Sequence, residues 1–145
     1  MVADMSFASP MPSGLRNSLR VIDYGMLIYW MLSGLSALGI IQLSGQYMYA
    51  GYGDPVMEAW NWSFAPLDML FALSGLYAVS VARSGTARWQ PFALVSFSLT
   101  FCAGLMAISF WAIIGFFDPF WWVPNIALMV IPAYWIFRIT RKVEV

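Results

Sequence analysis

Four long apolar stretches, each about the length of a membrane-spanning helix, dominate this sequence. They cover residues 21–42, 63–82, 91–115 and 122–140. A bilayer's hydrocarbon core is about 30 Å thick and needs roughly 20 residues of helix to cross it. Backbone polar groups inside lipid must be paired within the protein, which favours helices for stretches of this kind. The pattern predicts an all-α integral membrane bundle of four transmembrane helices.

The basic residues all lie on one side of these four stretches. They precede the first stretch, separate the second from the third, or follow the fourth. The seven are Arg16, Arg20, Arg83, Arg88, Arg138, Arg141 and Lys142. Lysine and arginine beside membrane helices are held on the cytoplasmic side. We therefore expect antiparallel helices in the cell inner (plasma) membrane, with both termini cytoplasmic.

The domain organisation follows from the same pattern. Residues 1–20 are predicted to be a cytoplasmic tail, residues 21–140 the four-helix transmembrane domain, and residues 141–145 a second short tail. The first tail contains Pro10, Pro12 and Gly14 and lacks the apolar core of a cleaved signal peptide. The one long outer connection, residues 43–60, is aromatic-rich and is interpreted as an interfacial cap or as a lid.

Composition excludes several classes of function. Hydrophobic residues make up 61% of the chain and charged residues only 10%, whereas soluble domains are about 25% charged. The chain has no histidine, which argues against haem ligation and a transition-metal site. Cys102 is the single cysteine and cannot form an internal disulfide. We expect no metal, no cofactor and no nucleic-acid partner.

Asp68 is the residue that most suggests chemistry. It lies about five positions inside the second stretch, with no basic residue within a turn. A carboxylate facing lipid is strongly unfavourable, so Asp68 must face inward, accept hydrogen bonds or take up a proton. Asp23 is instead interpreted as a charge at the inner interface close to Arg20. Asp118, in a polar turn, is also interpreted as structural.

Further polar residues continue the face that carries Asp68. Glu58 and Asn61 precede it at helical spacing, and small residues follow it on the same face. Small residues leave room for a ligand or for a neighbouring helix. Pro66 favours a helix start near residue 63, which would place Glu58 and Asn61 on a separate segment.

The outer half of the predicted bundle collects a set of candidate site residues. Asp68 and Glu58 are the candidate catalytic residues. The candidate ligand-binding residues are Asp54, Trp60, Asn61, Trp62, Ser109, Trp111, Trp122 and Asn125. Such a site could protonate an alkene and stabilise the cation on aromatic faces, or bind an amine- or hydroxyl-bearing amphiphile without reaction. These residues could equally form a cluster of polar side chains that only orients the helices.

Several motifs resemble known membrane families. The runs AWNWSF (59–64), PLD (66–68), LTFCAGL (99–105) and WWVPN (121–125) resemble the YvaD-like family of uncharacterised bacterial membrane proteins, over nearly the whole chain. The order DP (54–55), AW (59–60) and SFAPLDMLF (63–71) resembles the EXPERA group, which includes the sigma-2 receptor and is related to a sterol isomerase. The EXPERA resemblance implies a cavity for sterol- or isoprenoid-like ligands. It also implies Asp68 as the second-helix acid and Asp54 as the loop acid, although this chain lacks histidine.

We therefore predict a multi-pass membrane protein whose outer-half cavity binds an apolar sterol-, isoprenoid- or lipid-like ligand. Its enzymatic form would be an acid-catalysed isomerase or terpene-type cyclase, in which Asp68 donates the proton and Glu58 or Asp54 tunes it. Asn125 would orient the substrate. The alternatives are a non-enzymatic membrane subunit or scaffold and, less favoured, a small proton-coupled exporter. The expected partners are membrane lipids and the apolar small molecule, with a homodimer left open.

Overall fold

The computed structural model describes residues 10–44, 49, 51–85 and 87–141, and within these residues it is helical with no β-strand. The all-α prediction is therefore confirmed. Five helical segments follow one another along the chain. They are α1 (Ser13–Ala37), α2 (Pro55–Ser63), α3 (Ala65–Ala82), α4 (Trp89–Ile113) and α5 (Pro119–Thr140). Only Phe64 separates α2 from α3, so these two segments act as one long helix with a break.

Three helical spans are long and apolar enough to cross a membrane. They are Pro55–Ala82, Trp89–Ile113 and Pro119–Thr140. α1 is also long, at 25 residues, but its first half carries Arg16, Arg20 and Asp23, and it is not among the three. The structure is thus that of a helical membrane protein. α1 is less apolar than the other spans because of the charged residues in its first half.

The bounds of α1 differ from the prediction of residues 21–42. The helix begins directly after Pro12 and includes both arginines that were assigned to the tail. It ends at Ala37 because Gly39 adopts a left-handed φ of 70°. The backbone N–H of Ile40 then donates to Leu35 O at 3.0 Å and that of Gly39 donates to Ser36 O at 2.9 Å. This is the hydrogen-bond pattern of a glycine-terminated helix.

The earlier start of α1 corrects the interpretation of Asp23. A helix starting at residue 21 would leave Asp23 at the interface, but in a helix starting at Ser13 it lies about three turns from the helix start. Its side chain is fully buried, at 0% exposure. The interpretation of Asp23 as a charge at the inner interface close to Arg20 is therefore wrong.

The break between α2 and α3 follows from local chemistry. The Asp54 carboxylate accepts hydrogen bonds from the backbone N–H groups of Val56 and Met57, at 2.9 and 3.0 Å, and so caps the start of α2. Pro66 occupies the first turn of α3, where its missing N–H removes no helical bond. Pro66 thus places Glu58 and Asn61 on a separate segment, as its position in the sequence indicated.

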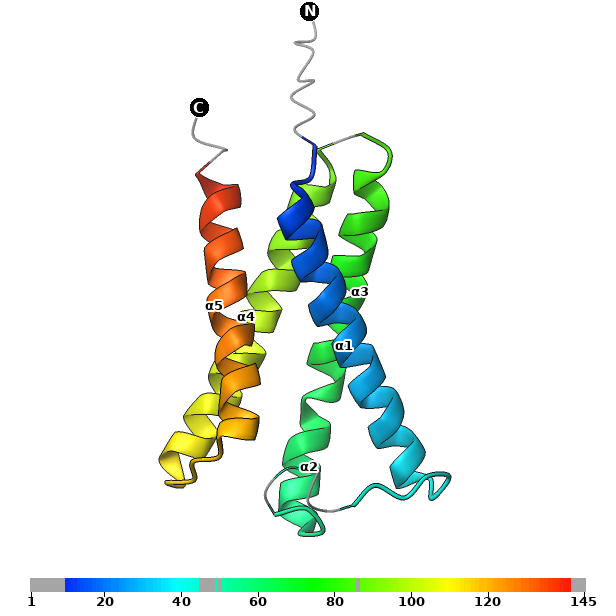
Figure 1. The fold of residues 1–145 in the computed structure, drawn as a ribbon, viewed down its shortest axis with the longest axis vertical. Coiled ribbons are helices and arrows are strands. Elements are labelled where there is room, and N and C mark those ends of the chain that lie inside the picture. The colour runs from blue at the N-terminus through cyan, green and yellow to red at the C-terminus, as the bar shows by residue number, and fades with distance from the viewer. Residues whose placement is uncertain (1–9, 45–48, 50, 86, 142–145) are drawn as a thin grey trace, which may run out of the picture.

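The helices pack as a bundle that is closed at one end. α3 packs against α1 and α4, and α4 packs against α5, while α1 and α5 barely touch (Figure 1). The start of α1, the α3–α4 connection and the end of α5 lie together at the upper end of Figure 1. α2 and the α4–α5 connection lie at the other end.

Two groups of buried residues fill the closed part of the bundle. The first, which we call the terminal core, lies near the described chain ends. It consists of Met11, Leu15, Leu19, Ala78, Val79, Trp89, Ala93, Phe97 and Ile139. The second, which we call the central layer, consists of Phe71, Ala72 and Ala103, with Ile22, Met26 and Leu27 of α1 packed against it. The central layer separates the terminal core from the half of the bundle described next.

Candidate functional site

A cavity of about 210 Å³ opens between the helices in the half away from the chain ends. Its wall is contributed by the second halves of α1 and α4, by the first parts of α3 and α5, and by α2 and Tyr49. The lining residues are Gly25, Met26, Tyr29, Trp30, Tyr49, Trp60, Asn61, Phe64, Asp68, Ala103, Ala107, Trp111, Trp121, Pro124, Asn125 and Leu128. The wall is therefore mostly aromatic and apolar, and Asp68 provides its one carboxyl group.

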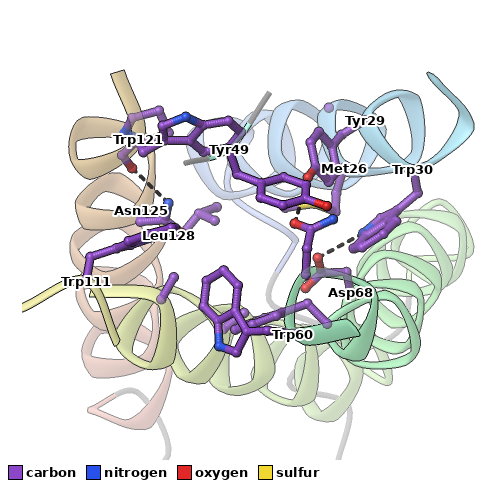
Figure 2. Close-up of a pocket in the computed structure, with 16 residues that line it drawn as sticks. Met26, Tyr29, Trp30, Tyr49, Trp60, Asp68, Trp111, Trp121, Asn125 and Leu128 are labelled. Atoms are coloured by element: carbon purple, nitrogen blue, oxygen red, sulfur yellow. Dashed lines mark hydrogen bonds between the residues drawn. The ribbon is translucent and has the colours of Figure 1, made fainter. Parts of the chain in front are cut away.

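Asp68 lies on the cavity wall and is 4% exposed (Figure 2). Its Oδ2 accepts a hydrogen bond from Trp30 Nε1 at 2.9 Å. Its Oδ1 is buried and has no hydrogen-bond partner among the described residues. Asp68 also sits in the first turn of α3, where the helix dipole favours a negative charge. One oxygen is thus fixed by the protein, and the other is left for a group in the cavity.

The side chains next to Asp68 are held by contacts between α1 and α2. Tyr29 Oη donates to Asn61 Oδ1 at 3.0 Å. The Trp30 ring packs edge-on against Tyr29 and tilted against Trp62, with centroid separations of 5.1 and 5.2 Å. Both residues of α1 therefore orient acceptors on α2 and α3, so the polar wall depends on α1 staying in place.

The opposite wall is built on α4 and α5. Asn125 Nδ2 donates to the Trp121 carbonyl at 2.8 Å, across the cavity from Asp68 (Figure 2). The Trp60 ring stacks on Phe110 at 4.2 Å and meets Trp111 edge-on at 5.3 Å. These contacts make a rigid aromatic surface, on which a cation or a flat apolar body can lie.

Tyr49, in the connection between α1 and α2, closes the cavity on a third side. Its side chain is 4% exposed, and burial together with the nearby Glu58 carboxylate raises its pKa to about 12. The phenol therefore stays neutral at physiological pH and offers a hydroxyl group rather than a charge.

Five of the ten candidate site residues meet at this cavity. They are Trp60, Asn61, Asp68, Trp111 and Asn125. Among the other lining residues, four have an aromatic ring with a hydrogen-bonding group and were not candidates from the sequence, namely Tyr29, Trp30, Tyr49 and Trp121. Trp121 takes the place expected of Trp122, whose Nε1 instead donates to the Phe116 carbonyl at 3.1 Å.

The other candidates lie outside the cavity. Glu58 and Trp62 line a neighbouring, more polar hollow of about 260 Å³ together with Ser33, Ser36 and Tyr52. The Asp54 carboxylate is occupied in capping α2. Ser109 is exposed on α4. The structure therefore does not bring Glu58 or Asp54 to the wall that carries Asp68.

A metal centre has no basis in the part of the chain that the structure describes, because no three or more His, Cys, Asp or Glu side chains gather there. The cavity can offer one carboxyl oxygen, an amide, hydroxyl groups and aromatic faces. Such a set of groups is suited to hydrogen bonding, to cation–π contacts and to proton transfer.

The fold and the three apolar spans define a helical membrane protein. The amino-acid sequence identifies the family more specifically than the fold does. Residues 15–144 match the family described as "Family of unknown function (DUF5360)", and the chain belongs to this family. It is 37% identical over 122 residues to the uncharacterised protein YvaD of Bacillus subtilis (strain 168), covering 84% of this chain and 88% of that protein. The YvaD-like resemblance is thus confirmed, and no solved structure matches the chain.

Proposed function

We propose that this protein binds, within the membrane, an amphiphile with an apolar body and a hydrogen-bond-donating, positively charged head. The observation that carries the proposal is the buried Asp68 Oδ1, which has no partner among the described residues and lies on the wall of an aromatic cavity. A buried polar atom without a partner is costly. A donor on the ligand would satisfy it.

The charge distribution favours a protonated amine as the head group. No lysine or arginine lines the cavity, so a bound cation would meet Asp68 without a competing positive charge. The rings of Trp60, Trp111 and Trp121 present faces that attract cations. A hydroxyl head could donate the same hydrogen bond but would gain less from the aromatic faces.

The size of the cavity limits which part of the ligand it encloses. Its 210 Å³ is below the roughly 300–1,000 Å³ of pockets that enclose drug-sized ligands. We infer that it holds the head and the first carbons of a lipid-, sterol- or isoprenoid-like molecule. The rest would extend into the bilayer between α1 and α5, which barely touch.

The orientation that we propose has antiparallel helices with both termini in the cytoplasm. All six described arginines lie at or near the end that holds the chain termini and the α3–α4 connection. The positive-inside rule would place that end in the cytoplasm. The cavity would then face the outer leaflet of the inner (plasma) membrane.

Acid-catalysed isomerisation or cyclisation is the second candidate function. Asp68 would transfer its proton to an alkene, and the aromatic faces would stabilise the carbocation. The Asp68 carboxylate would then take a proton from a carbon next to the cationic centre, which forms the new double bond and restores the acid. The EXPERA resemblance implies substrates of the same sterol- or isoprenoid-like class. In this form Asp68 acts without Glu58 and Asp54, because neither lines the cavity.

The test measures binding of dodecylamine, dodecanol and dodecane to the purified full chain by native mass spectrometry. Dodecylamine should bind most tightly. Asp68→Asn removes a charge-assisted hydrogen bond of about 1.5–3 kcal/mol, which corresponds to a roughly 10- to 150-fold loss of amine affinity. Asp118→Asn is the matched control, since this acid lies at the same end and caps α5, a role that asparagine can also fill. It should bind dodecylamine normally.

The alternatives give different results in the same experiment. Equal amine affinity of the Asp68→Asn variant and the unmodified protein would contradict the proposal. Absence of saturable binding for all three probes would favour the scaffold interpretation. A product formed from an isoprenoid or sterol mixture, and lost in Asp68→Asn, would establish the catalytic form.

A further inference from the structure

A second carboxyl group, Asp23, is buried more deeply than Asp68 and has no role in the cavity. It is 0% exposed, and neither of its oxygens has a hydrogen-bond partner among the described residues. Ser96 on α4 is also 0% exposed, and its Oγ has no partner either. Three buried polar atoms without partners at one place call for a function, because each costs free energy.

Three helices converge at this place. A Cβ built on Gly75 of α3 would overlap with Asp23 Oδ2 and would lie 2.7 Å from Ser96 Oγ. Asp23 from α1 and Ser96 from α4 therefore both press against the bare backbone of Gly75. The neighbouring hydroxyl of Thr100 is already used, since it donates to the Ser96 carbonyl at 2.8 Å.

The surroundings do not supply a counter-charge. On α1 the nearest ionisable side chains are Arg20 and Tyr24. On α3 they are Asp68, two turns before Gly75, and Tyr77, about half a turn after it. The part of α4 packed here has no charged residue, and its one thiol, Cys102, is exposed. None of these groups forms a hydrogen bond with Asp23.

There is also no space for a hydrated ion. Asp23 and Ser96 line none of the hollows described above, and Asp23 Oδ2 is in direct contact with Gly75. The terminal core and the central layer lie on either side and are apolar. A metal ion needs several oxygen ligands around it, whereas a proton needs only the carboxyl oxygen itself.

We propose that Asp23 and Ser96 form a proton-binding site, separate from the cavity, whose proton exchanges only when α1 moves away from α3. In the closed bundle Asp23 carries its proton and is neutral. On opening, the carboxyl O–H bond breaks, the proton passes to water, and a carboxylate remains. Once α1 has moved, water and the flexible side chain of Arg20, three residues earlier on the same helix, can stabilise that carboxylate. Rebinding of the proton restores the neutral acid and lets α1 close against Gly75.

The site is mechanically linked to the cavity through α1. Asp23 and Trp30 are seven residues apart, about two turns or roughly 10 Å along the helix. Asp23 contacts Gly75, and Trp30 donates to Asp68, which are also seven residues apart on α3. Movement of α1 at Asp23 would therefore shift Trp30 and Tyr29 at the cavity wall. Only this link to ligand binding rests on the proposed function; the proton site does not.

Infrared difference spectroscopy of the full-length protein tests the proton site without any ligand. The unmodified protein at neutral pH should show a protonated-carboxyl C=O absorption that is missing from Asp23→Asn and that disappears as the pH is raised. Ser96→Ala keeps the carboxyl group and should shift the frequency of this absorption. Identical carboxyl absorption in the unmodified protein and Asp23→Asn at neutral pH would overturn the proposal, whatever the result of the amine-binding test.

Thermal unfolding as a function of pH tests the movement of α1. The neutral acid is favoured in the folded bundle. The thermal stability of the protein should therefore fall as the pH rises to the value at which the absorption disappears. Asp23→Asn cannot ionise and should lack this fall. Gly75→Ala should abolish or shift the absorption by forcing Asp23 aside, while Gly34→Ala, where an added Cβ meets nothing within 4 Å, should not. An equal loss of stability with pH in the unmodified protein and in Asp23→Asn would refute the opening step.

Discussion

The two halves of the bundle are built from the same helices but packed in different ways. In the terminal core, Leu19, Phe97 and Ala93 are fully buried and belong to one apolar cluster. In the cavity half, large rings such as Trp60 and Trp111 contact one another but enclose a void. One half therefore supplies most of the packing, which allows the other to keep a cavity and a carboxyl oxygen without a partner.

The largest effect is expected from Phe97→Ala in the terminal core. The ring is fully buried at 0% exposure, and removing such a ring costs about 3–5 kcal/mol through lost contacts and the space left behind. Trp60→Ala, which enlarges an existing cavity, should cost less although the side chain is larger. Reversible unfolding in mixed micelles measures both. Equal losses would show that the two halves contribute alike to stability.

A smaller loss is expected from Gly104→Ala, where α4 meets α5. An added Cβ would lie 2.7 Å from the Asn125 carbonyl oxygen and 3.1 Å from Leu128 Cβ. Because one of these atoms belongs to the backbone, the helices must separate, at a cost of about 1–3 kcal/mol. Amine binding should weaken too, since Asn125 and Leu128 line the cavity. Gly34→Ala on α1 is the control and should leave both quantities unchanged or slightly improve stability.

The smallest effect is expected from Asp54→Ala at the start of α2. The substitution removes an N-cap worth about 1 kcal/mol and should leave the terminal core intact. Hydrogen exchange should become faster at the amides of Val56 and Met57, which donate to Asp54. Exchange in α4 should not change. Faster exchange throughout the protein would mean that α2 supports the whole bundle and not only the cavity wall.

Hydropathy was sufficient to predict the helical fold and the inward position of Asp68. A carboxyl group five residues inside an apolar stretch has few stable environments, so its burial follows from the sequence. The burial of Asp23 does not follow from hydropathy, because its environment depends on where α1 begins. The apolar stretch starts at residue 21, but the helix continues back to Ser13 through Arg16 and Arg20, whose long side chains can reach polar surroundings.

The lining of the cavity was less predictable, because it depends on helix rotation. Trp121 and Trp122 are adjacent, and adjacent residues on a helix point about 100° apart. The Asp118 cap and the start of α5 at Pro119 decide that Trp121 faces inward. Trp30 lies in a stretch that is apolar on all sides, so no pattern marked the face that meets Asp68. The only feature of Trp30 that suggests a contact with Asp68 is its indole N–H, which can donate a hydrogen bond to a carboxylate.

Gly75 also restricts how members of this family can diverge. At this position any side chain would collide with Asp23 and Ser96, whereas Gly25 and Gly34 have no such neighbour within 4 Å. A lineage that acquires alanine at position 75 must first shorten the acid at position 23, and one that regains the acid must first restore glycine. The two positions are therefore expected to change in a fixed order during evolution, and relatives with an acid at the equivalent of residue 23 should carry glycine opposite it.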